Sequence, residues 1–334
     1  MIKVQNLTKI YGSNVAVNGI SFTVEKGKIY GFLGPNGAGK STTMNIVTGC
    51  LAATEGKVLI DGHDIYEEPI QAKKLIGYLP EVPPLYPEMT VYEYLMFIAG
   101  AKKVPSIDRN DKVTSLMEQI GLASVCDRLI GNLSKGYRQR VGIAQAMLGD
   151  PEIIILDEPT VGLDPRQVIE VRELIASLAK EHTVIISSHI LSEIQQMCDN
   201  VIIISNGRIV ANGTLASLTE NASGYNTVVM KIKGAPDAAF GIIDAMEEIS
   251  HFEITEDDDG NTDAVLTVPA QYDVRETLFK SFAENGVPVL EMYAKRPSLE
   301  EIYMRLTESV PTREEASAEE DDGGYEPIFA KEEG

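Results

Sequence analysis

The sequence has few cysteines, no long apolar run and no surplus of basic residues. Its three cysteines, Cys50, Cys126 and Cys198, show neither CxxC nor CxH spacing. This pattern excludes a disulfide framework and a cysteine-based zinc site. It indicates free thiols in a reducing compartment. The simplest interpretation is that the three cysteines are small buried side chains.

The longest apolar runs, such as Ile153–Leu156 and Val201–Ile204, have the length of a strand. A membrane-spanning helix needs about 18 apolar residues or more. The N-terminus, MIKVQNLTKIYG, also lacks the apolar core of a signal peptide. We therefore expect a cytoplasmic chain that acts on a membrane, if at all, through a partner.

The excess of acidic residues is uneven along the 334-residue chain. The formal net charge of −21 divides into −4 for residues 1–224, −9 for residues 225–306, −1 for Glu308 and −7 for residues 313–334. An acidic C-terminal third repels nucleic acid and anionic lipid, so we expect no nucleic-acid partner. A length sufficient for two domains and a hydrophobic content of 44% indicate a substantial core.

Short β-rich runs and turns fill the first sixty residues, and residues 41–50 favour a helix. Residues 87–150 then favour helices, before the buried-type strands 153–156 and 183–187, each followed by a helical stretch. This alternation predicts an α/β domain over residues 1–220, with a parallel core sheet covered on both faces. An antiparallel β flank and a helical subdomain at about 87–150 complete the expected fold.

After a polar break, TENASGY at residues 219–225, the pattern changes to a small α+β domain. The order of expected elements is βαββαβ, typical of a ferredoxin-like domain, over residues 225–307. The expected elements are the strands 227–233, 251–255, 264–268 and 289–293 and the helices 238–248, 274–285 and 298–307. Residues 311–334 have few apolar side chains and many carboxylates, which predicts a disordered acidic tail. The acidic hairpin loop DDDGNTD lacks EF-hand spacing, so a solvated turn is favoured over a Ca²⁺ site.

A glycine-rich stretch, FLGPNGAGKST at residues 32–42, has the spacing of a phosphate-binding loop, G-x-x-x-x-G-K-[ST]. It follows an apolar strand and precedes a helix, so backbone N–H groups and the positive end of the helix would hold phosphates. Lys40 would contact the β- and γ-phosphates, and the Ser41 hydroxyl would bind Mg²⁺. The residues expected to contact the nucleotide here are Gly34, Pro35, Asn36, Gly37, Ala38, Gly39, Lys40, Ser41 and Thr42. A glycine-rich turn without a ligand is the plainer alternative.

Two further strand ends carry polar residues that would complete this site. Asp157 and Glu158 follow the buried strand 153–156, where Asp157 would hold Mg²⁺ and Glu158 would act as general base on a water molecule. His189 follows the strand 183–187 and would face the γ-phosphate. The alternatives are a simple turn before Pro159 and a histidine with a structural role.

In this order the motifs resemble the nucleotide-binding subunit of ABC transporters over residues 1 to about 220. The phosphate loop resembles Walker A, and Ile153–Asp157 resembles Walker B, with Glu158 in the place of the catalytic glutamate. Asp164, in the sequence GLD, resembles the D-loop, and His189 resembles the switch histidine. Tyr11, in KIYG, is similar to the aromatic residue that stacks on adenine. The resemblance thus implies ATP and Mg²⁺ as cofactors and ATP hydrolysis as the reaction.

The stretch LSKGYRQR, residues 133–140, resembles the ABC signature, whose usual form is Leu-Ser-Gly-Gly-Gln. The resemblance implies that Ser134, Gly136 and the helix N-terminus bind a γ-phosphate held by the loop of a second subunit. ATP would then join two copies head-to-tail in a symmetric pair with two composite sites. An ordinary capped surface helix is the alternative.

Three positions depart from the family pattern. Lys135 replaces a glycine and Tyr137 replaces the glutamine of the signature, while Glu81 stands where the Q-loop glutamine is expected. A carboxylate at this position can still ligate Mg²⁺, as we expect of Glu81, but it would add negative charge beside the phosphates. The segment VPPLYPEMT that follows is suited to docking a membrane subunit, or is a plain ordered loop.

The resemblance implies an ATPase subunit, peripheral on the inner face of the cell membrane, which powers a separately encoded membrane permease. The motifs YLPE and LSKGYRQR and the ending PSLEEIYMRLT favour ATPases of exporters with multidrug, lipid or gliding-type partners. The alternative is a soluble ABC ATPase that is not linked to transport. A single cassette, a short helical insertion and the lack of basic patches argue against that alternative.

Overall fold

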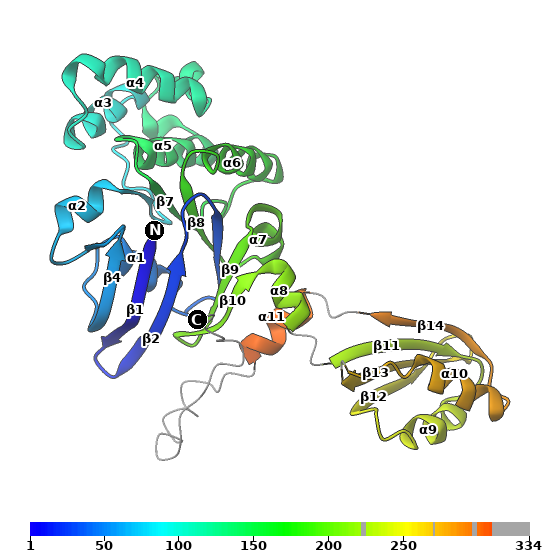
Figure 1. The fold of residues 1–334 in the computed structure, drawn as a ribbon. Coiled ribbons are helices and arrows are strands. Elements are labelled where there is room, and N and C mark those ends of the chain that lie inside the picture. The colour runs from blue at the N-terminus through cyan, green and yellow to red at the C-terminus, as the bar shows by residue number, and fades with distance from the viewer. Residues whose placement is uncertain (222–224, 270, 296–298, 309–334) are drawn as a thin grey trace. The chain divides into compact units, whose positions relative to one another are not determined.

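The structure is a computed structural model that describes residues 1–221, 225–269, 271–295 and 299–308. The described residues divide into two compact units, one of Met1–Thr214 with residues 306–308, and one within Leu215–Arg305. Figure 1 shows their elements. The predicted acidic tail, residues 311–334, lies outside the described residues, as does part of the predicted polar break.

The first unit contains a six-stranded central sheet in the order β10-β9-β3-β8-β7-β6. Its strands are β3 (Ile29–Leu33), β6 (Ile76–Leu79), β7 (Ile153–Asp157), β8 (Thr183–Ser188), β9 (Asn200–Ser205) and β10 (Arg208–Thr214). All neighbouring strands run parallel except β10, which is antiparallel to β9. Every residue of β3, β7, β8 and β9 is buried, which confirms the prediction of a covered parallel sheet from continuous apolar runs.

A second, antiparallel sheet forms the predicted β flank, in the order β2-β1-β4-β5. Its strands are β1 (Ile2–Tyr11), β2 (Asn14–Val24), β4 (Glu55–Ile60) and β5 (His63–Asp64). One face of this sheet packs against the central sheet, because Ile2, Val4 and Leu7 share a core with Ile155, Ile185 and Ile202. The Phe22 and Phe32 rings, 5.7 Å apart at their centroids, join the two sheets.

Helices surround the central sheet and form the predicted helical segment (Figure 1). The helices of this unit are α1 (Lys40–Val47), α2 (Pro69–Lys74), α3 (Val91–Ala101), α4 (Ser106–Gln119), α5 (Lys135–Met147), α6 (Pro165–Leu178) and α7 (Leu191–Met197). Two 3-10 turns, Ala123–Val125 and Ile130–Asn132, connect α4 to α5. The start of α3 is fixed by a capping box, in which Thr90 and Glu93 exchange side-chain and backbone hydrogen bonds.

The second unit contains a four-stranded antiparallel sheet, in the order β12-β13-β11-β14. The remaining elements of the chain are α8 (Leu215–Asn221), β11 (Tyr225–Ile232), α9 (Pro236–Asp244), β12 (His251–Glu256), β13 (Thr262–Pro269), α10 (Arg275–Glu284), β14 (Val289–Lys295) and α11 (Leu299–Glu308). From β11 to β14 the order of elements is βαββαβ. The assignment of this unit as a ferredoxin-like domain stays a prediction.

Helices α9 and α10 pack on one face of this four-stranded sheet. Ile243 of α9 and Phe282 of α10 are buried against Met230 and Leu266 of the sheet. Helix α9 ends at Asp244, four residues earlier than the sequence predicts. Met246 and Ile249 pack against the core beyond that point, which ends the helix and leads the chain into β12.

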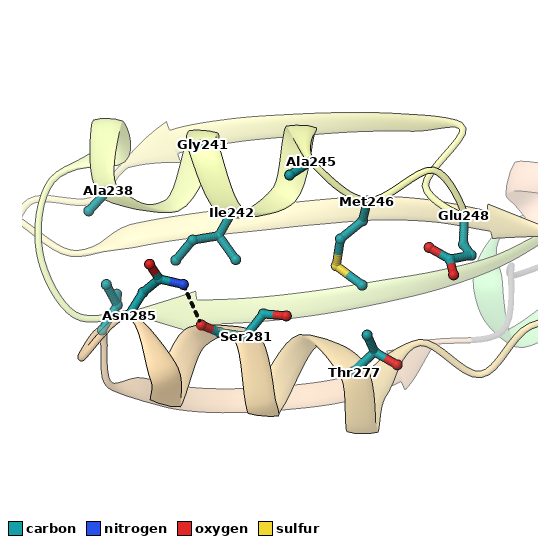
Figure 2. A pocket seen from close by; sticks show the side chains of 10 residues that line it. Ala238, Gly241, Ile242, Ala245, Met246, Glu248, Thr277, Ser281 and Asn285 are labelled. Carbon is teal, nitrogen blue, oxygen red and sulfur yellow. Dashed lines mark hydrogen bonds between the residues drawn. The ribbon is translucent and has the colours of Figure 1, made fainter.

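A hollow of about 670 Å³ lies between α9 and α10 (Figure 2). Ile242 and Met246 line one side, and Thr277, Ser281 and Asn285 follow one another along α10 on the other side. Among the described residues that line it, Glu248 is the one titratable side chain and none is basic. These residues do not provide the positive charge that a phosphate requires.

Candidate functional site

The phosphate loop connects β3 to α1 and is held tightly by its neighbours. A Cβ atom at Gly34 would clash with the backbone oxygen of Ile204, and one at Gly39 would lie 2.6 Å from the backbone oxygen of Ala16. Gly39 also has φ of 106°, in the left-handed region that favours glycine. The two glycines therefore let the loop pass between β2 and β9 and turn directly into α1.

The Lys40 side chain curls back over this loop. Its Nζ atom donates to the backbone oxygens of Gly34 at 2.8 Å and Pro35 at 3.3 Å, and lies 3.4 Å from Glu158 Oε1. Lys40 is only 6% exposed. A buried cation beside the N–H groups at the start of a helix provides the positive charge and the donors that suit a phosphate.

Asp157 ends β7 beside the end of β8, where the strand register pairs it with Ser187. The Ser187 hydroxyl donates to Asp157 Oδ1, and the Glu158 N–H donates to the same hydroxyl oxygen at 3.2 Å. Burial raises the pKa of Asp157, although hydrogen bonds from Ser187 and Ser41 act in the opposite direction. Ser187 is not among the site residues predicted from the sequence, although a hydroxyl at the end of an apolar strand is a signal for such a role.

These contacts bring together Ser41 and Asp157, two of the three predicted Mg²⁺ ligands. The described residues hold no cluster of three His, Cys, Asp or Glu side chains that would bind a metal by itself. A site with one hydroxyl and one carboxylate suits Mg²⁺, which usually takes one or two carboxylates together with phosphate oxygens and water. Ser41 and Asp157 therefore fit the ion that the sequence implies.

Glu158 joins Lys40 to His189. The His189 Nδ1 atom lies 2.9 Å from Glu158 Oε2 and 3.1 Å from Oε1. With Glu158 ionised, Nδ1 must carry the proton in this contact. Glu158 has φ of 49°, a left-handed conformation that is strained for a residue with a side chain. The loop thus holds a 7%-exposed carboxylate between two basic groups, at the end of the buried strand β7.

The signature stretch begins α5 and packs against the D-loop of the same chain. Ser134 is the N-cap, and its hydroxyl accepts from the Tyr137 N–H at 3.4 Å. A Cβ atom at Gly136 would lie 2.7 Å from the Gln167 side chain, and one at Gly162 would clash with Lys135 Nζ. The signature and the D-loop therefore form one continuous surface.

Asp164 is the N-cap of α6, and its Oδ1 atom accepts from the Gln167 N–H at 2.9 Å. Among the described residues, no hydrogen bond or ion pair links Ser134, Gly136 or Asp164 to the phosphate loop. Their predicted contacts with a nucleotide stay predictions.

The arginines of α5 are engaged within the chain. Arg138 donates to the backbone oxygen of Leu133 at 2.8 Å. Arg140 donates to the backbone oxygen of Ile120 at 2.9 Å and to Glu170 Oε2 at 2.5 Å. These two guanidinium groups thus have partners within the chain, and the predicted contact with a phosphate would fall to the first turn of the helix.

The far end of α5 is held by Lys102, which the sequence analysis did not single out. Its Nζ atom donates to the backbone oxygens of Gln145, Ala146 and Leu148, at 2.8, 3.0 and 2.7 Å. A lysine in this position satisfies the last carbonyls of a helix and complements its dipole. The signature helix is thus anchored at both ends.

Two predicted site residues lie at the edges of the region. Tyr11 ends β1, is 47% exposed, and carries Lys9 Nζ 5.1 Å from its ring centroid. Glu81 follows β6 and is exposed, and it forms no hydrogen bond or ion pair within the described part of the chain. Stacking on adenine by Tyr11 and Mg²⁺ binding by Glu81 stay predictions.

Comparisons with known proteins agree with this geometry. A family model described as "ABC transporter" matches residues 17–161. The chain is 37% identical to the bacitracin transport ATP-binding protein BcrA of Bacillus licheniformis, over 92% of this chain and 97% of that protein. It is 30% identical to the linearmycin resistance ATP-binding protein LnrL of Bacillus subtilis, over 92% of this chain and 98% of that protein.

Solved structures share part of the fold. The structure of an ATP binding subunit of an ABC transporter has a TM-score of 0.61 and 30% identity, over 66% of this chain and 92% of that chain. The dimeric structure of MJ0796, a bacterial ABC transporter cassette, has a TM-score of 0.59 and 26% identity, over 64% of this chain and 99% of that chain. The matches to BcrA and LnrL are longer, so both proteins resemble this chain beyond the part that these structures cover.

Proposed function

The chain belongs to the ATP-binding subunits of ABC transporters, and from this premise we propose that it powers export through a separate membrane permease. The observation that carries the proposal is the cluster of Lys40, Asp157, Glu158 and His189 around the phosphate loop. These side chains come from the start of α1, the end of β7 and the loops that follow β7 and β8. They provide a phosphate cation, a metal carboxylate, a general base and a group that orients the base.

Each residue has a distinct task in ATP hydrolysis. The loop N–H groups and Lys40 bind the β- and γ-phosphates, and Lys40 exchanges its backbone partners for phosphate oxygens. Ser41 and Asp157 hold Mg²⁺, which neutralises charge on the phosphates when it is bound. Glu158 accepts a proton from the attacking water, while His189 keeps the Glu158 carboxylate in place.

A second copy of the chain is proposed to complete each site. Ser134 and Lys135 are exposed at the start of α5, beside Gly162 of the D-loop, and form a surface on which a phosphate can be received. A dimeric cassette is among the solved structures that resemble this chain. We place the signature of one copy over the phosphate loop of the other, so that ATP joins them.

The loop after β6 is the proposed contact for the permease. It exposes apolar side chains, with Val82 79%, Tyr86 45% and Phe97 of the adjoining α3 49% accessible. The Tyr86 ring lies 5.7 Å from Phe97 and 5.8 Å from Tyr94, so the aromatic groups form one cluster. Exposed apolar side chains gathered in this way support a contact with another protein. No helix in the described ranges has the length and apolar composition to cross a membrane.

The direction of transport is inferred from the relatives. Their names refer to bacitracin transport, linearmycin resistance and, for SrtF of Streptococcus pyogenes, lantibiotic transport. SrtF is 37% identical over 63% of this chain and 89% of its own length. We infer a cargo of this antimicrobial kind, moved outward by the permease.

The proposal is tested with the Glu158→Gln variant of the full chain. Its mass in solution is measured with and without Mg-ATP, and its rate of phosphate release is compared with that of the unmodified chain. We expect a dimer only with Mg-ATP and loss of hydrolysis by about 100-fold or more. Glu118→Gln, an exposed position on α4, serves as the control. Equal hydrolysis by the unmodified chain and Glu158→Gln would contradict the assigned base.

A further inference from the structure

Glu193 carries a buried carboxylate that the mechanism above does not use. It lies in the first turn of α7 and is only 8% exposed. Within the described ranges it has no Lys, Arg or His partner. Burying a carboxylate without a cation is costly, and hydrogen bonds to its charged oxygens are what offset that cost.

The hydrogen bonds of Glu193 come from two separate segments of the chain. Its Oε2 atom accepts from the Thr160 hydroxyl at 2.6 Å and from the Ser188 hydroxyl at 3.3 Å. Thr160 and Ser188 are themselves 4% and 1% exposed. One carboxylate oxygen thus connects the segment that follows β7 to the end of β8.

Both donors adjoin residues of the hydrolytic site. Thr160 is two positions after Glu158 and opens the D-loop, where its backbone oxygen accepts from the Leu163 N–H at 3.2 Å. Ser188 directly precedes His189, and its hydroxyl accepts from the Ile190 N–H at 3.0 Å. A displacement of either segment changes the contact between Glu158 and His189.

We propose that Glu193 is a positioning residue for ATP hydrolysis, which holds the Glu158 and D-loop segment in register with the His189 loop. Among the described residues, Glu193 forms no hydrogen bond or ion pair with the phosphate loop or with Lys40, Asp157, Glu158 or His189. It acts through Thr160 and Ser188 on the distance between the base and the histidine. This inference rests on the ATPase function proposed above.

The role predicts an effect on the chemical step and not on nucleotide binding. Glu193→Met keeps the length of the side chain but removes the acceptor, so we expect kcat to fall by about 10- to 100-fold. The KM for ATP should stay within about twofold, because Lys40 and the loop glycines are untouched. Glu193→Gln retains one carbonyl oxygen where Oε2 lies. This variant should keep most of the kcat of the unmodified chain, in contrast to Glu193→Met.

A double-mutant cycle isolates the proposed link. Thr160→Val removes the strongest donor, and it should lower kcat in the same way as Glu193→Met. The combined variant should be no slower than the more severe single variant, because both changes break one connection. Thr183→Val is the matched control, since Thr183 is equally buried on β8 but accepts from the Gly27 N–H at the opposite end of the strand.

The experiment measures phosphate release against ATP concentration, binding of a fluorescent ATP analogue and the melting temperature of each full-length variant. Unchanged kcat in Glu193→Met, additive effects in the cycle, or an equal loss in Thr183→Val would overturn the positioning role. If Glu193→Met does not fold, Thr160→Val and Glu193→Gln carry the same test. An unmodified chain that hydrolyses no ATP would contradict the proposed function itself, and this inference with it.

Discussion

The phosphate loop and the signature stretch both begin a helix and both contain glycine and serine, yet they differ in burial and in packing. At the phosphate loop, the glycines press against backbone atoms, and Lys40 is buried with three partners. At the signature, Ser134 is exposed, and Gly136 faces the end of a flexible glutamine side chain. One half of the proposed site is thus complete within the chain, while the other becomes a site only against a second molecule.

The sharpest test of this comparison pairs Lys40→Ala with Ser134→Arg. Both variants should lose hydrolysis by about 100-fold or more, because each removes one half of the composite site. Only Lys40→Ala should lose nucleotide affinity, whereas Ser134→Arg should bind ATP as a monomer. Equilibrium binding and solution mass measure the difference. Loss of ATP binding in a folded Ser134→Arg monomer would break the comparison.

The next largest difference is expected in stability, when alanine replaces Gly34 in the phosphate loop or Gly136 in the signature stretch. At Gly34 the added methyl group meets the Ile204 backbone oxygen, which cannot move without displacing β9. We expect Gly34→Ala to cost about 2 kcal/mol or more of unfolding free energy and to abolish ATP binding. At Gly136 the neighbour is the Gln167 side chain, which can rotate away, so Gly136→Ala should cost less than about 1 kcal/mol. Denaturant titration of both variants decides between these values.

A smaller change in unfolding free energy is expected for Asp157→Asn, and this substitution should stabilise the chain. Since burial raises the pKa of this carboxyl above its unfolded value, the charged form destabilises the folded chain at neutral pH. Asp157→Asn should therefore raise unfolding free energy by about 1 kcal/mol at pH 7 while it abolishes Mg²⁺-dependent hydrolysis.

The sign of this effect has a pH dependence that serves as its control. As the pH falls through the raised pKa of Asp157, the carboxyl group takes up a proton. The folded unmodified chain then no longer carries a destabilising buried charge. The stability gain of Asp157→Asn should then shrink toward zero on acidification. A gain that stays constant at acidic pH would show that the charge is not its cause.

The smallest effect is expected from Lys135→Gly, which restores the usual signature residue. The Lys135 ammonium lies over Gly162, so its loss removes one contact between the signature and the D-loop. Glycine in the first turn of a helix also costs up to about 1 kcal/mol. We expect hydrolysis to change by no more than about threefold, with unchanged ATP binding by the monomer. A tenfold change would indicate that Lys135 itself contacts the phosphate.

Much of this site could be predicted because its signals are local. The phosphate loop is a spacing of adjacent residues, and the apolar run before Asp157 identifies a buried strand without knowledge of its neighbours. The parallel sheet and the antiparallel flank followed from the same runs.

Contacts between distant residues could not be predicted in this way. The sequence around Arg140 does not indicate that its guanidinium group donates hydrogen bonds to Glu170 and Ile120, which lie 30 and 20 positions away. The pairing of Asp157 with Ser187 depends on strand register, and the contact of Glu193 with Thr160 spans 33 positions. These are tertiary contacts, and they decide which polar residues act in the site and which only support it.

The position of β3 in the central sheet has a consequence for the time at which a newly made chain first acquires activity. This strand carries the phosphate loop, and it lies between β8 and β9, which the ribosome synthesises much later. The loop is also braced by Ile204 of β9. A nascent chain can therefore bind ATP only after residue 205 has left the ribosome, and a fragment that ends within α6 would carry an intact Walker A sequence with no nucleotide site.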